Sequence, residues 1–317
     1  MTREKLKGHA AMLAANMSWG LMSPISKSIF LIGTISAISL TTFRLAGAAI
    51  VFWIASLFTR KEPVSGRDQF KLFWASLFGI TLNQGSFVFG ISMTSPIDAS
   101  VVATSSPIIT MILAAIVLKE PLTGKKVLGV LTGLSGALLL IFSNGFPGNT
   151  ASQGSNPVLG NFLCLCAEIA FSLYFVLFKD LIDRYSPITL MKWMFLYAGI
   201  CCIPFSWGEL LTIPYAELPL EIIGDIAFII FGATFFSYLM VPIGQKRLRP
   251  TIVSMYNYVQ PLTASMLAVW WGMDRFTLPK AAAILLIFTG VWIVTRSKSR
   301  AQVEAERAAR QAEKPMS

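Results

Sequence analysis

Hydrophobic residues are gathered into ten long runs, and short polar or charged stretches separate these runs. A helix needs about 20 apolar residues to cross about 30 Å of hydrocarbon, and the runs have about this length. The pattern therefore predicts ten membrane-spanning helices, near residues 8–32, 36–58, 70–93, 96–119, 125–143, 157–179, 186–207, 221–243, 250–272 and 278–296. Little chain is left over, so we expect no separate soluble catalytic domain.

The second half of the chain repeats the first. Residues that recur 154 positions later are Pro96, Ser100, Pro107, Leu113, Thr123, Lys126 and Gly136, which match Pro250, Ser254, Pro261, Leu267, Thr277, Lys280 and Gly290. Near the N-terminus an offset of 152 aligns Ala15 with Ala167 and places Asn16 on Glu168. Five spans fit into each half, so the two copies must sit upside down relative to one another. The predicted units are a first repeat (1–145), a periplasmic linker (146–156), a second repeat (157–296) and a charged cytoplasmic tail (297–317).

The composition and the distribution of charge agree with a membrane protein. Hydrophobic residues make up 55% of the chain and charged residues 13%, and the mean hydropathy is +0.66. Lys and Arg concentrate in the connections on one side of the predicted membrane, whereas the opposite connections hold only Arg275 and Lys280. This bias places both termini in the cytoplasm, and we expect a multi-pass protein of a bacterial inner membrane. The net charge of +10 arises from these connections, so it predicts no nucleic-acid partner.

Two polar residues fall at the midplane of repeat-equivalent spans. Glu168 is near the centre of the sixth predicted span, and Asn16 is at a similar depth in the first. Hydrocarbon makes such groups costly unless they face a cavity or a partner. Glu168 is therefore a candidate for lining a substrate cavity, and a protonated carboxyl bonded to a neighbouring helix is the alternative. For Asn16, a helix–helix hydrogen bond and a substrate contact stay open.

Arg44 lies in the outer half of the second predicted span, too deep to reach the headgroups easily. It should have a carboxylate or several carbonyl groups as partners. Because a guanidinium can satisfy many buried acceptors at once, we expect a structural charge here rather than a substrate contact.

The fourth and ninth predicted spans each carry a proline near mid-span, preceded by polar residues. The two runs are Thr104-Ser105-Ser106-Pro107 and Asn257-Tyr258-Val259-Gln260-Pro261. A proline inside a helix releases a backbone carbonyl and bends the helix. Pro107 and Pro261 are therefore hinge candidates, with plain packing as the alternative. The polar residues beside them, Ser106, Asn257 and Gln260, are candidates for cavity lining.

Further candidates lie at the same depth. Asn83 and Gln84 add polarity to the third span, and Trp19 lies one turn from Asn16. With Tyr238 on the eighth span, these residues could line an apolar-walled cavity with a few polar groups, which is the usual form of a small-molecule site. Core packing is the alternative for each single aromatic side chain.

Nothing in the sequence predicts an enzyme. His9 is the only histidine, the four cysteines all fall inside predicted spans, and no Walker sequence or metal-ligand spacing occurs. We therefore expect no catalytic residues, no metal and no cofactor.

Several motifs resemble a known family. They are Gly90-Ile-Ser-Met-Thr-Ser-Pro-Ile-Asp-Ala-Ser100, Ser106-Pro107, Leu118-Lys-Glu-Pro-Leu-Thr123 and Gly129 through Gly136, together with Asn16-x-x-Trp19-Gly20 and Phe43-Arg44. They resemble the EamA repeat of the drug/metabolite transporter superfamily, over about residues 8–296. The resemblance implies an all-α integral membrane protein of ten helices in two inverted five-helix repeats. It also implies a central cavity lined by spans 1, 3, 4, 6, 8 and 9. The second copy departs from the pattern at residues 273–277.

The function that follows is a secondary-type transporter that works by alternating access between the repeats. We expect it to move a small metabolite, an amino acid or a related amphipathic compound, outward across the inner membrane. Its partners would be the small-molecule substrate and the lipid bilayer. Proton coupling and uniport both stay open, as do a monomer and a homodimer. The alternatives are a membrane-embedded enzyme, a non-transporting scaffold, or a flippase for a lipid-linked headgroup.

Overall fold

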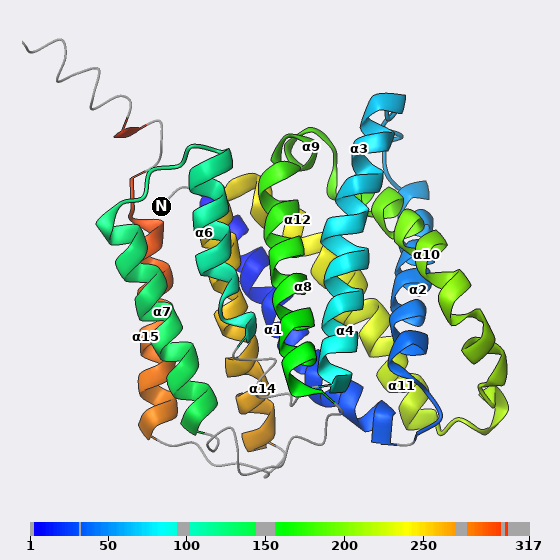
Figure 1. Ribbon diagram of the computed structural model, residues 1–317. Helices are drawn as coiled ribbons and strands as arrows, with labels where there is room; N and C mark the ends of the chain where they lie inside the picture. The colour runs from blue at the N-terminus through cyan, green and yellow to red at the C-terminus, as the bar shows by residue number, and fades with distance from the viewer. Residues whose placement is uncertain are drawn as a thin grey trace, which may run out of the picture.

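The computed structural model describes residues 3–31, 33–93, 102–143, 156–270, 278–298 and 302–303. Within these ranges every regular element is helical, and the long helices form one bundle (Figure 1). The elements are α1 (Arg3–Leu31), α2 (Ala37–Leu57), α3 (Gly66–Ser76), η1 (Leu77–Leu82), α4 (Asn83–Met93), α6 (Ser106–Val117), α7 (Gly124–Ser143), α8 (Pro157–Leu177), α9 (Lys179–Arg184), α10 (Pro187–Thr212), η2 (Tyr215–Glu217), α11 (Leu220–Phe228), η3 (Ile229–Phe236), α12 (Ser237–Arg247), α13 (Pro250–Met255), η4 (Tyr256–Tyr258), α14 (Val259–Trp270) and α15 (Leu278–Thr295). Residues 146–155 of the predicted linker, the departing motif at 273–277 and most of the tail lie outside the described residues.

Five helices are long and apolar enough to cross a membrane. They are Ala37–Leu57, Gly66–Ile91, Val158–Leu177, Pro187–Thr212 and Leu220–Arg247, and two shorter apolar helices are Ser106–Val117 and Ala281–Thr295. Large apolar side chains such as Ile54, Phe205 and Leu285 are exposed on the outside of the bundle. An apolar outer face is what lipid tails require, so the chain is a multi-pass membrane protein.

Two of the long helices contain a π-helical segment in the middle. η1 connects α3 to α4, and η3 connects α11 to α12. η1 ends at Leu82 and η3 at Phe236, so the two segments end 154 positions apart, at the offset of the sequence repeat. Such segments are rare and are found mostly at functional sites. Each is directly followed by a polar residue, Asn83 after η1 and Ser237 after η3.

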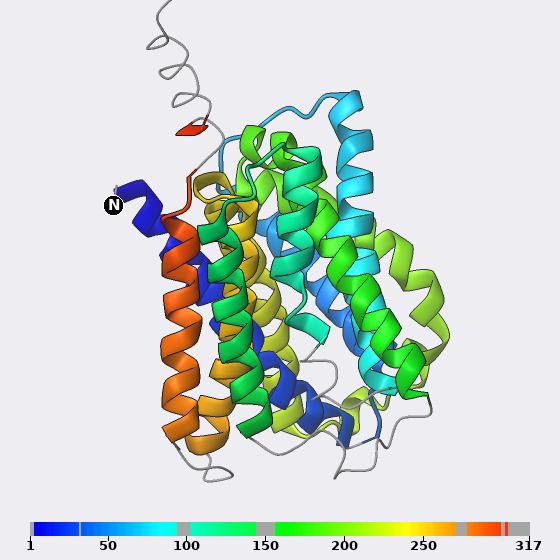
Figure 2. The same cartoon turned by 60° about the vertical axis from the view of Figure 1, so that its left-hand side comes forward.

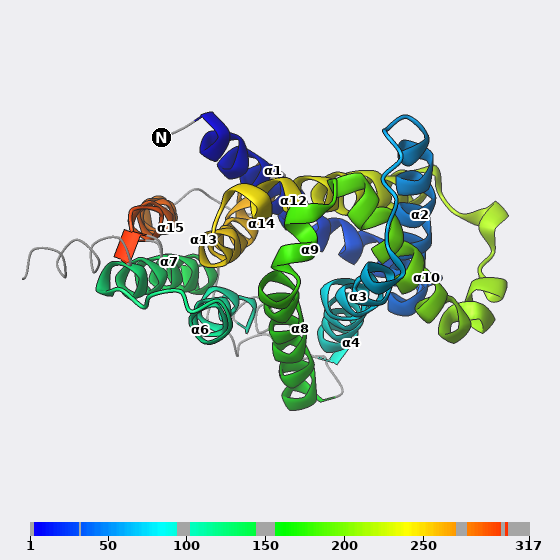
Figure 3. The same ribbon diagram turned by 90° about the horizontal axis from the view of Figure 1, so that it is seen from above.

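The helices of the two halves pack in corresponding pairs, as Figures 2 and 3 show. α7 packs against α15, and α2 packs against α10. α1 packs against α12 in the same way that α8 packs against α4. The α1–α12 contact thus has its counterpart in the α8–α4 contact, and the α7–α15 and α2–α10 contacts each join two corresponding helices.

Glycines at the α4–α8 and α12–α1 crossings also correspond between the two halves. A Cβ atom at Gly90 would lie 2.6 Å from Cys164 Sγ, and one at Gly244 would lie 2.4 Å from Met12 Sδ. Gly90 and Gly244 are 154 positions apart, and Met12 and Cys164 are 152 apart, so the crossing is made twice with equivalent residues. The two helix pairs can approach this closely because neither glycine carries a side chain.

The Gly129-x-x-x-Gly133 motif is used inside the fold. A Cβ atom at Gly129 would lie 2.8 Å from the Gly290 carbonyl oxygen, and one at Gly290 would lie 2.6 Å from the Gly129 carbonyl oxygen. α7 and α15 therefore pack backbone to backbone along this motif, as close-packing glycines in membrane helices commonly do.

Carboxylates cap the paired helices α2 and α10 at opposite ends. Ser36 begins α2, and its hydroxyl donates to the Glu209 carboxylate near the end of α10. Ser186 begins α10, and both its N–H (3.0 Å) and its hydroxyl (2.8 Å) donate to Glu62 Oε2, just beyond the end of α2. Burial acts to raise the pKa of Glu62, but these hydrogen bonds outweigh it and hold that pKa below its ordinary value. A negative charge at a helix N-terminus is stabilising.

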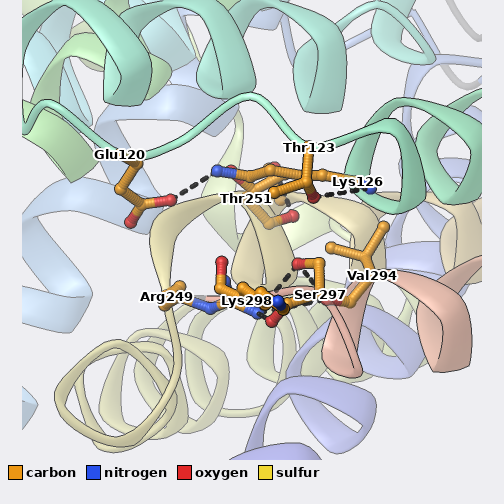
Figure 4. A network of polar contacts seen from close by, with 9 residues as sticks. Glu120, Thr123, Lys126, Arg249, Thr251, Val294, Ser297 and Lys298 are labelled. Carbon is orange, nitrogen blue, oxygen red and sulfur yellow. Dashed lines mark hydrogen bonds and ion pairs between the residues drawn. The ribbon is translucent and has the colours of Figure 1, made fainter. Parts of the chain in front are cut away.

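A second group of charges lies at the end of the bundle where α6, α7, α13 and α15 meet (Figure 4). Lys126 is fully buried, and its Nζ is 2.5 Å from Glu120 Oε2. Arg249 donates to the carbonyl oxygens of Val294 (3.1 Å), Ser297 (3.0 Å) and Lys298 (3.1 Å). The guanidinium therefore caps the C-terminal end of α15, where the free carbonyls and the helix dipole favour a cation.

Candidate functional site

The structure connects the polar side chains predicted at the midplane through contacts between helices. We call this set the central polar layer, and it consists of Asn16, Asn83, Gln84, Ser106, Glu168, Ser237, Tyr238, Asn257 and Gln260. Eight of these residues were candidates from the sequence. Ser237 was missed, although it stands 154 positions after Asn83, and that offset was the signal that could have found it.

One contact of the layer is made twice with different chemistry. Gln260 Nε2 donates to Asn16 Oδ1 over 2.9 Å. At the equivalent positions, the hydroxyl of Ser106 lies beside the carboxyl group of Glu168. Asn257 adds a link between the halves, because its Nδ2 donates to Ser106 Oγ over 3.1 Å.

A second contact is also made twice, by the residues that follow the π-helical segments. Asn83 Nδ2 donates to the Ala167 carbonyl oxygen over 3.1 Å. Ser237 Oγ donates to the Ala15 carbonyl oxygen over 3.2 Å. Each donor reaches the residue directly before Glu168 or Asn16. The π-helical segments thus hold α4 against α8 and α12 against α1 at the level of the two midplane residues.

The third contact joins two equivalent residues to each other. Gln84 Nε2 donates to the Tyr238 hydroxyl over 2.8 Å, and these residues are 154 positions apart. Both are almost fully buried. This bond therefore joins two positions that correspond in the sequence repeat.

The two versions of the first contact differ in how well their polar atoms are satisfied. Asn16 uses both ends of its amide, because Nδ2 donates to the Met12 carbonyl oxygen (2.9 Å) while Oδ1 accepts from Gln260. Glu168 is only 7% exposed, and its Oε2 is buried with no partner among the described residues. A buried oxygen left unpaired costs free energy. Asn16 thus makes the helix–helix hydrogen bond that was one of its two predicted roles, whereas Glu168 keeps an acceptor available.

Aromatic side chains border the layer. The half-buried Trp19 makes edge-to-face contacts with Tyr238 (5.5 Å between ring centroids) and with Phe171 (5.9 Å). Tyr238 also packs edge-to-face on Phe195 at 5.0 Å. Trp19 and Tyr238 therefore make the core-packing contacts that were the alternative for single aromatics, while the Tyr238 hydroxyl is part of the polar layer.

Each of the two prolines follows a short interruption in the α-helical pattern. Pro107 stands in the first turn of α6, directly after Ser106, and Pro261 stands in the first turn of α14, after the 3₁₀ turn η4. The α-helical hydrogen-bond pattern is thus interrupted just before each proline, near the place where the sequence suggested a bend. A proline in a first turn removes no internal hydrogen bond, which explains why these positions accept it.

The surroundings of Arg44 also differ from the expectation. Its side chain is buried, and its Nε donates to Thr234 Oγ1 on η3 over 3.2 Å. We expected a carboxylate or several carbonyls as partners. Among the described residues, neither a carboxylate nor a carbonyl accepts from it.

Comparisons with known proteins agree on one family. The model of the EamA-like transporter family matches residues 6–142 and 158–296. An uncharacterized transporter of Archaeoglobus fulgidus is 24% identical over 88% of this chain and 95% of its own length. The uncharacterized transporter YyaM of Bacillus subtilis is 23% identical over 81% and 84%. A WAT1-related protein of Arabidopsis thaliana is 25% identical over 93% and 87%.

A solved structure has the same fold. It aligns with a TM-score of 0.75 over 93% of this chain and 99% of its own, at 19% sequence identity. At this identity the likeness concerns the fold alone. The family match, in contrast, covers both halves of the chain separately and nearly completely. This multi-pass membrane protein belongs to the EamA-like transporter family.

Proposed function

We propose that the protein is a secondary-type carrier that moves a small metabolite, such as an amino acid or a related amphipathic compound, outward across a bacterial inner membrane. The family membership supports a transporter of small molecules, since relatives along the whole chain are named as transporters. The names of the family and of these relatives indicate a transporter rather than an enzyme. The bias of Lys and Arg in the sequence supports cytoplasmic termini.

Ten spans in two inverted five-helix repeats are part of this proposal. Three sets of contacts support it: the twin glycine crossings at Gly90 and Gly244, the mutual approach of Gly129 and Gly290, and the bond between Gln84 and Tyr238. Each of them is explained by a two-fold axis between the halves. Because each half has five predicted spans, such an axis would lie in the membrane plane. The proposed repeats are 1–145 and 157–296, joined by the linker 146–156, with the tail 297–317 following.

Alternating access follows from the same arrangement. A carrier built from two equivalent halves can open to either side by rocking one half against the other around a fixed site. The backbone breaks before Pro107 and Pro261 lie beside Ser106 and Gln260, which belong to the polar layer. We therefore propose these breaks as the hinges of the motion.

A single observation carries the choice of the binding site. The layer offers one carboxyl, Glu168, whose Oε2 lacks a partner among the described residues, at a position where the other half has the satisfied amide of Asn16. Such an oxygen can accept from a substrate amine or can take a proton. Gln84 Oε1 is likewise buried without a described partner and offers a neutral acceptor nearby in the layer.

Reconstituted protein with the Glu168→Gln change tests this assignment. If Glu168 exchanges a proton for substrate, transport driven by a pH gradient stops, while counterflow between equal substrate pools continues. If Glu168 binds a substrate amine, both processes weaken together, because a charge-assisted hydrogen bond is lost. Unchanged rates in both assays would remove Glu168 from the site. The substrates come from a thermal-shift screen of amino acids, polyamines, nucleobases and sugars, since a ligand stabilises the state it binds.

A flippase for a lipid-linked headgroup is the second candidate within transport. It differs in one measurable respect, because its substrate would enter from the bilayer. A carrier of soluble metabolites should exchange substrates between the aqueous phases of liposomes made of a single neutral lipid. Failure of every soluble compound in that assay would favour the flippase.

A further inference from the structure

The one buried cation that lacks an acidic partner in the described bundle is Arg44. Its side chain is only 6% exposed, and its Nε donates to Thr234 Oγ1 over 3.2 Å. By contrast, the buried Lys126 is paired with Glu120, and Arg249 is bonded to three carbonyl oxygens. An ionisable group inside a membrane protein is costly and marks a functional site by default.

Most of the guanidinium is left over for another partner. A guanidinium has five N–H donors, and Nε accounts for one of them. Neither terminal nitrogen has a partner among the described residues, and neither is among the polar atoms that are fully enclosed without one. The outer edge of the fork is therefore left without a partner among the described residues. Its two terminal nitrogens are arranged to bind two oxygen atoms of one oxyanion.

Arg44 also borders the central polar layer. Thr234 belongs to η3, the segment that leads into Ser237 and Tyr238. The charge of Arg44 lies within electrostatic range of the Tyr238 hydroxyl, which accepts from Gln84. Glu168 belongs to the same layer but makes no ion pair with Arg44. Glu168 in the layer and Arg44 at its border are thus an acid and a base that do not form an ion pair with each other.

We propose that Arg44 binds an oxyanion, a carboxylate or a phosphate, carried by the transported molecule. A cargo with an anionic group and a hydrogen-bond donor would satisfy Arg44 and Glu168 together, and a purely cationic cargo would leave Arg44 unpaired. That the anion is cargo rests on the proposed transport function. Anion binding itself rests on the contacts of Arg44.

A structural role for Arg44 predicts the opposite stability effect. Removal of a cation that anchors several groups leaves those groups unpaired and is destabilising, whereas removal of an unpaired buried charge is neutral or stabilising. Arg44→Met keeps an unbranched apolar side chain of similar length, so it isolates the charge. Lys192→Met is the matched control, because Lys192 lies over the Trp53 ring (5.0 Å), away from the polar layer.

The test compares thermal unfolding of the purified full-length wild type, Arg44→Met, Arg44→Lys and Lys192→Met in detergent. Sodium acetate and sodium phosphate are titrated against sodium chloride at equal ionic strength and pH. Wild type and Lys192→Met should be stabilised by at least one oxyanion. Arg44→Met should need an anion concentration at least about tenfold higher, which corresponds to about 1.4 kcal/mol of lost binding. Arg44→Lys, which keeps the charge but not the fork, should fall between them. The oxyanion that acts at the lower concentration identifies the class of anionic group.

Three results would overturn the proposal: no oxyanion effect on the wild type, an equal effect on Arg44→Met, or an Arg44→Met protein much less stable than wild type in chloride alone. An Arg44→Met protein that does not fold counts as the third of these results, and an unchanged oxyanion response of Arg44→Lys would separately contradict a forked contact.

Reconstitution separates the two proposals. An Arg44-dependent oxyanion effect without transport of any compound would refute the carrier and leave the anion site. Transport at the wild-type rate by Arg44→Met would show that the anion is not the cargo.

Discussion

The two midplane residues Asn16 and Glu168 occupy equivalent positions but differ in what their surroundings leave available. Both ends of the Asn16 amide are hydrogen-bonded, one to Met12 and the other to Gln260. In Glu168, by contrast, one carboxyl oxygen has no hydrogen-bond partner among the described residues. Two positions that correspond in the sequence repeat therefore have similar surroundings, and the difference in residue type leaves an unpaired acceptor at only one of them. The residue type at such a position can therefore differ between the two halves while the packing of the surrounding helices stays similar.

The largest expected effect comes from making the two positions alike. Glu168→Asn places an amide at both, so the layer loses its acid while the helix contacts remain. We expect substrate-dependent transport to fall at least about tenfold, because a charge-assisted hydrogen bond or a proton carrier is lost. The unfolding temperature should fall only modestly, because the change removes one buried methylene group, worth about 0.8 kcal/mol, and the Ser106 contact. Initial rates in liposomes, normalised to folded protein, measure the first effect, and thermal unfolding measures the second.

A change at Asn16, whose amide is fully hydrogen-bonded, sharpens the comparison. Asn16→Ala removes the acceptor of Gln260 and leaves the buried Met12 carbonyl to other partners, so we expect a loss of stability of about 1–2 kcal/mol. Transport per folded molecule should stay within a few-fold of wild type. The control is Asn16→Asp, which keeps an acceptor for Gln260. If Asn16→Ala abolished transport without destabilising the protein, Asn16 would be a substrate contact and the contrast with Glu168 would fail.

The sequence repeat predicted which residues correspond, but it could not predict which of them touch. Gln84 and Tyr238 were both candidates, yet the hydrogen bond between them depends on how the two halves pack against each other, which the repeat does not specify. The π-helical segments were not foreseen, because no residue type specifies the wider turn. Thr234 was missed for a related reason. A threonine can satisfy its own hydroxyl on a nearby carbonyl, as Thr234 does on Ile229, so its role beside Arg44 leaves no signal in the sequence.

The positions of the prolines show the same limit. A proline near the middle of an apolar run reads equally well as a bend or as the start of a new helix. The structure has a turn before Pro107 and a 3₁₀ turn before Pro261. Hydrophobicity could not reveal these breaks, because the run continues through them. The glycine motif in α7 was easier to interpret, since close backbone packing is almost the only use for such spacing inside a membrane.

The twin glycine crossings test whether equivalent contacts are equally rigid. A Cβ atom at Gly90 would meet the Gly160 carbonyl oxygen at 2.8 Å as well as Cys164 Sγ, whereas the closest atoms to one at Gly244 belong to the flexible Met12 side chain. Gly90→Ala should therefore destabilise more, by about 1–3 kcal/mol, while Gly244→Ala should cost less because Met12 can change its rotamer. Thermal unfolding of both variants measures the difference. Equal losses would mean that the two crossings yield to the same extent.

The smallest expected effect concerns the carboxylates that cap α2 and α10. The pKa of Glu62 lies below its ordinary value in the folded protein, so its charged form contributes stability at neutral pH. That contribution is lost as the pH falls below the ordinary value, through the lowered pKa of the folded state.

Glu62→Gln should remove about 0.3–1 kcal/mol at pH 7 and almost nothing at pH 3. Unfolding temperatures of wild type and variant at both pH values give the answer. A gap between Glu62→Gln and wild type that persisted at pH 3 would show that geometry rather than charge holds this end.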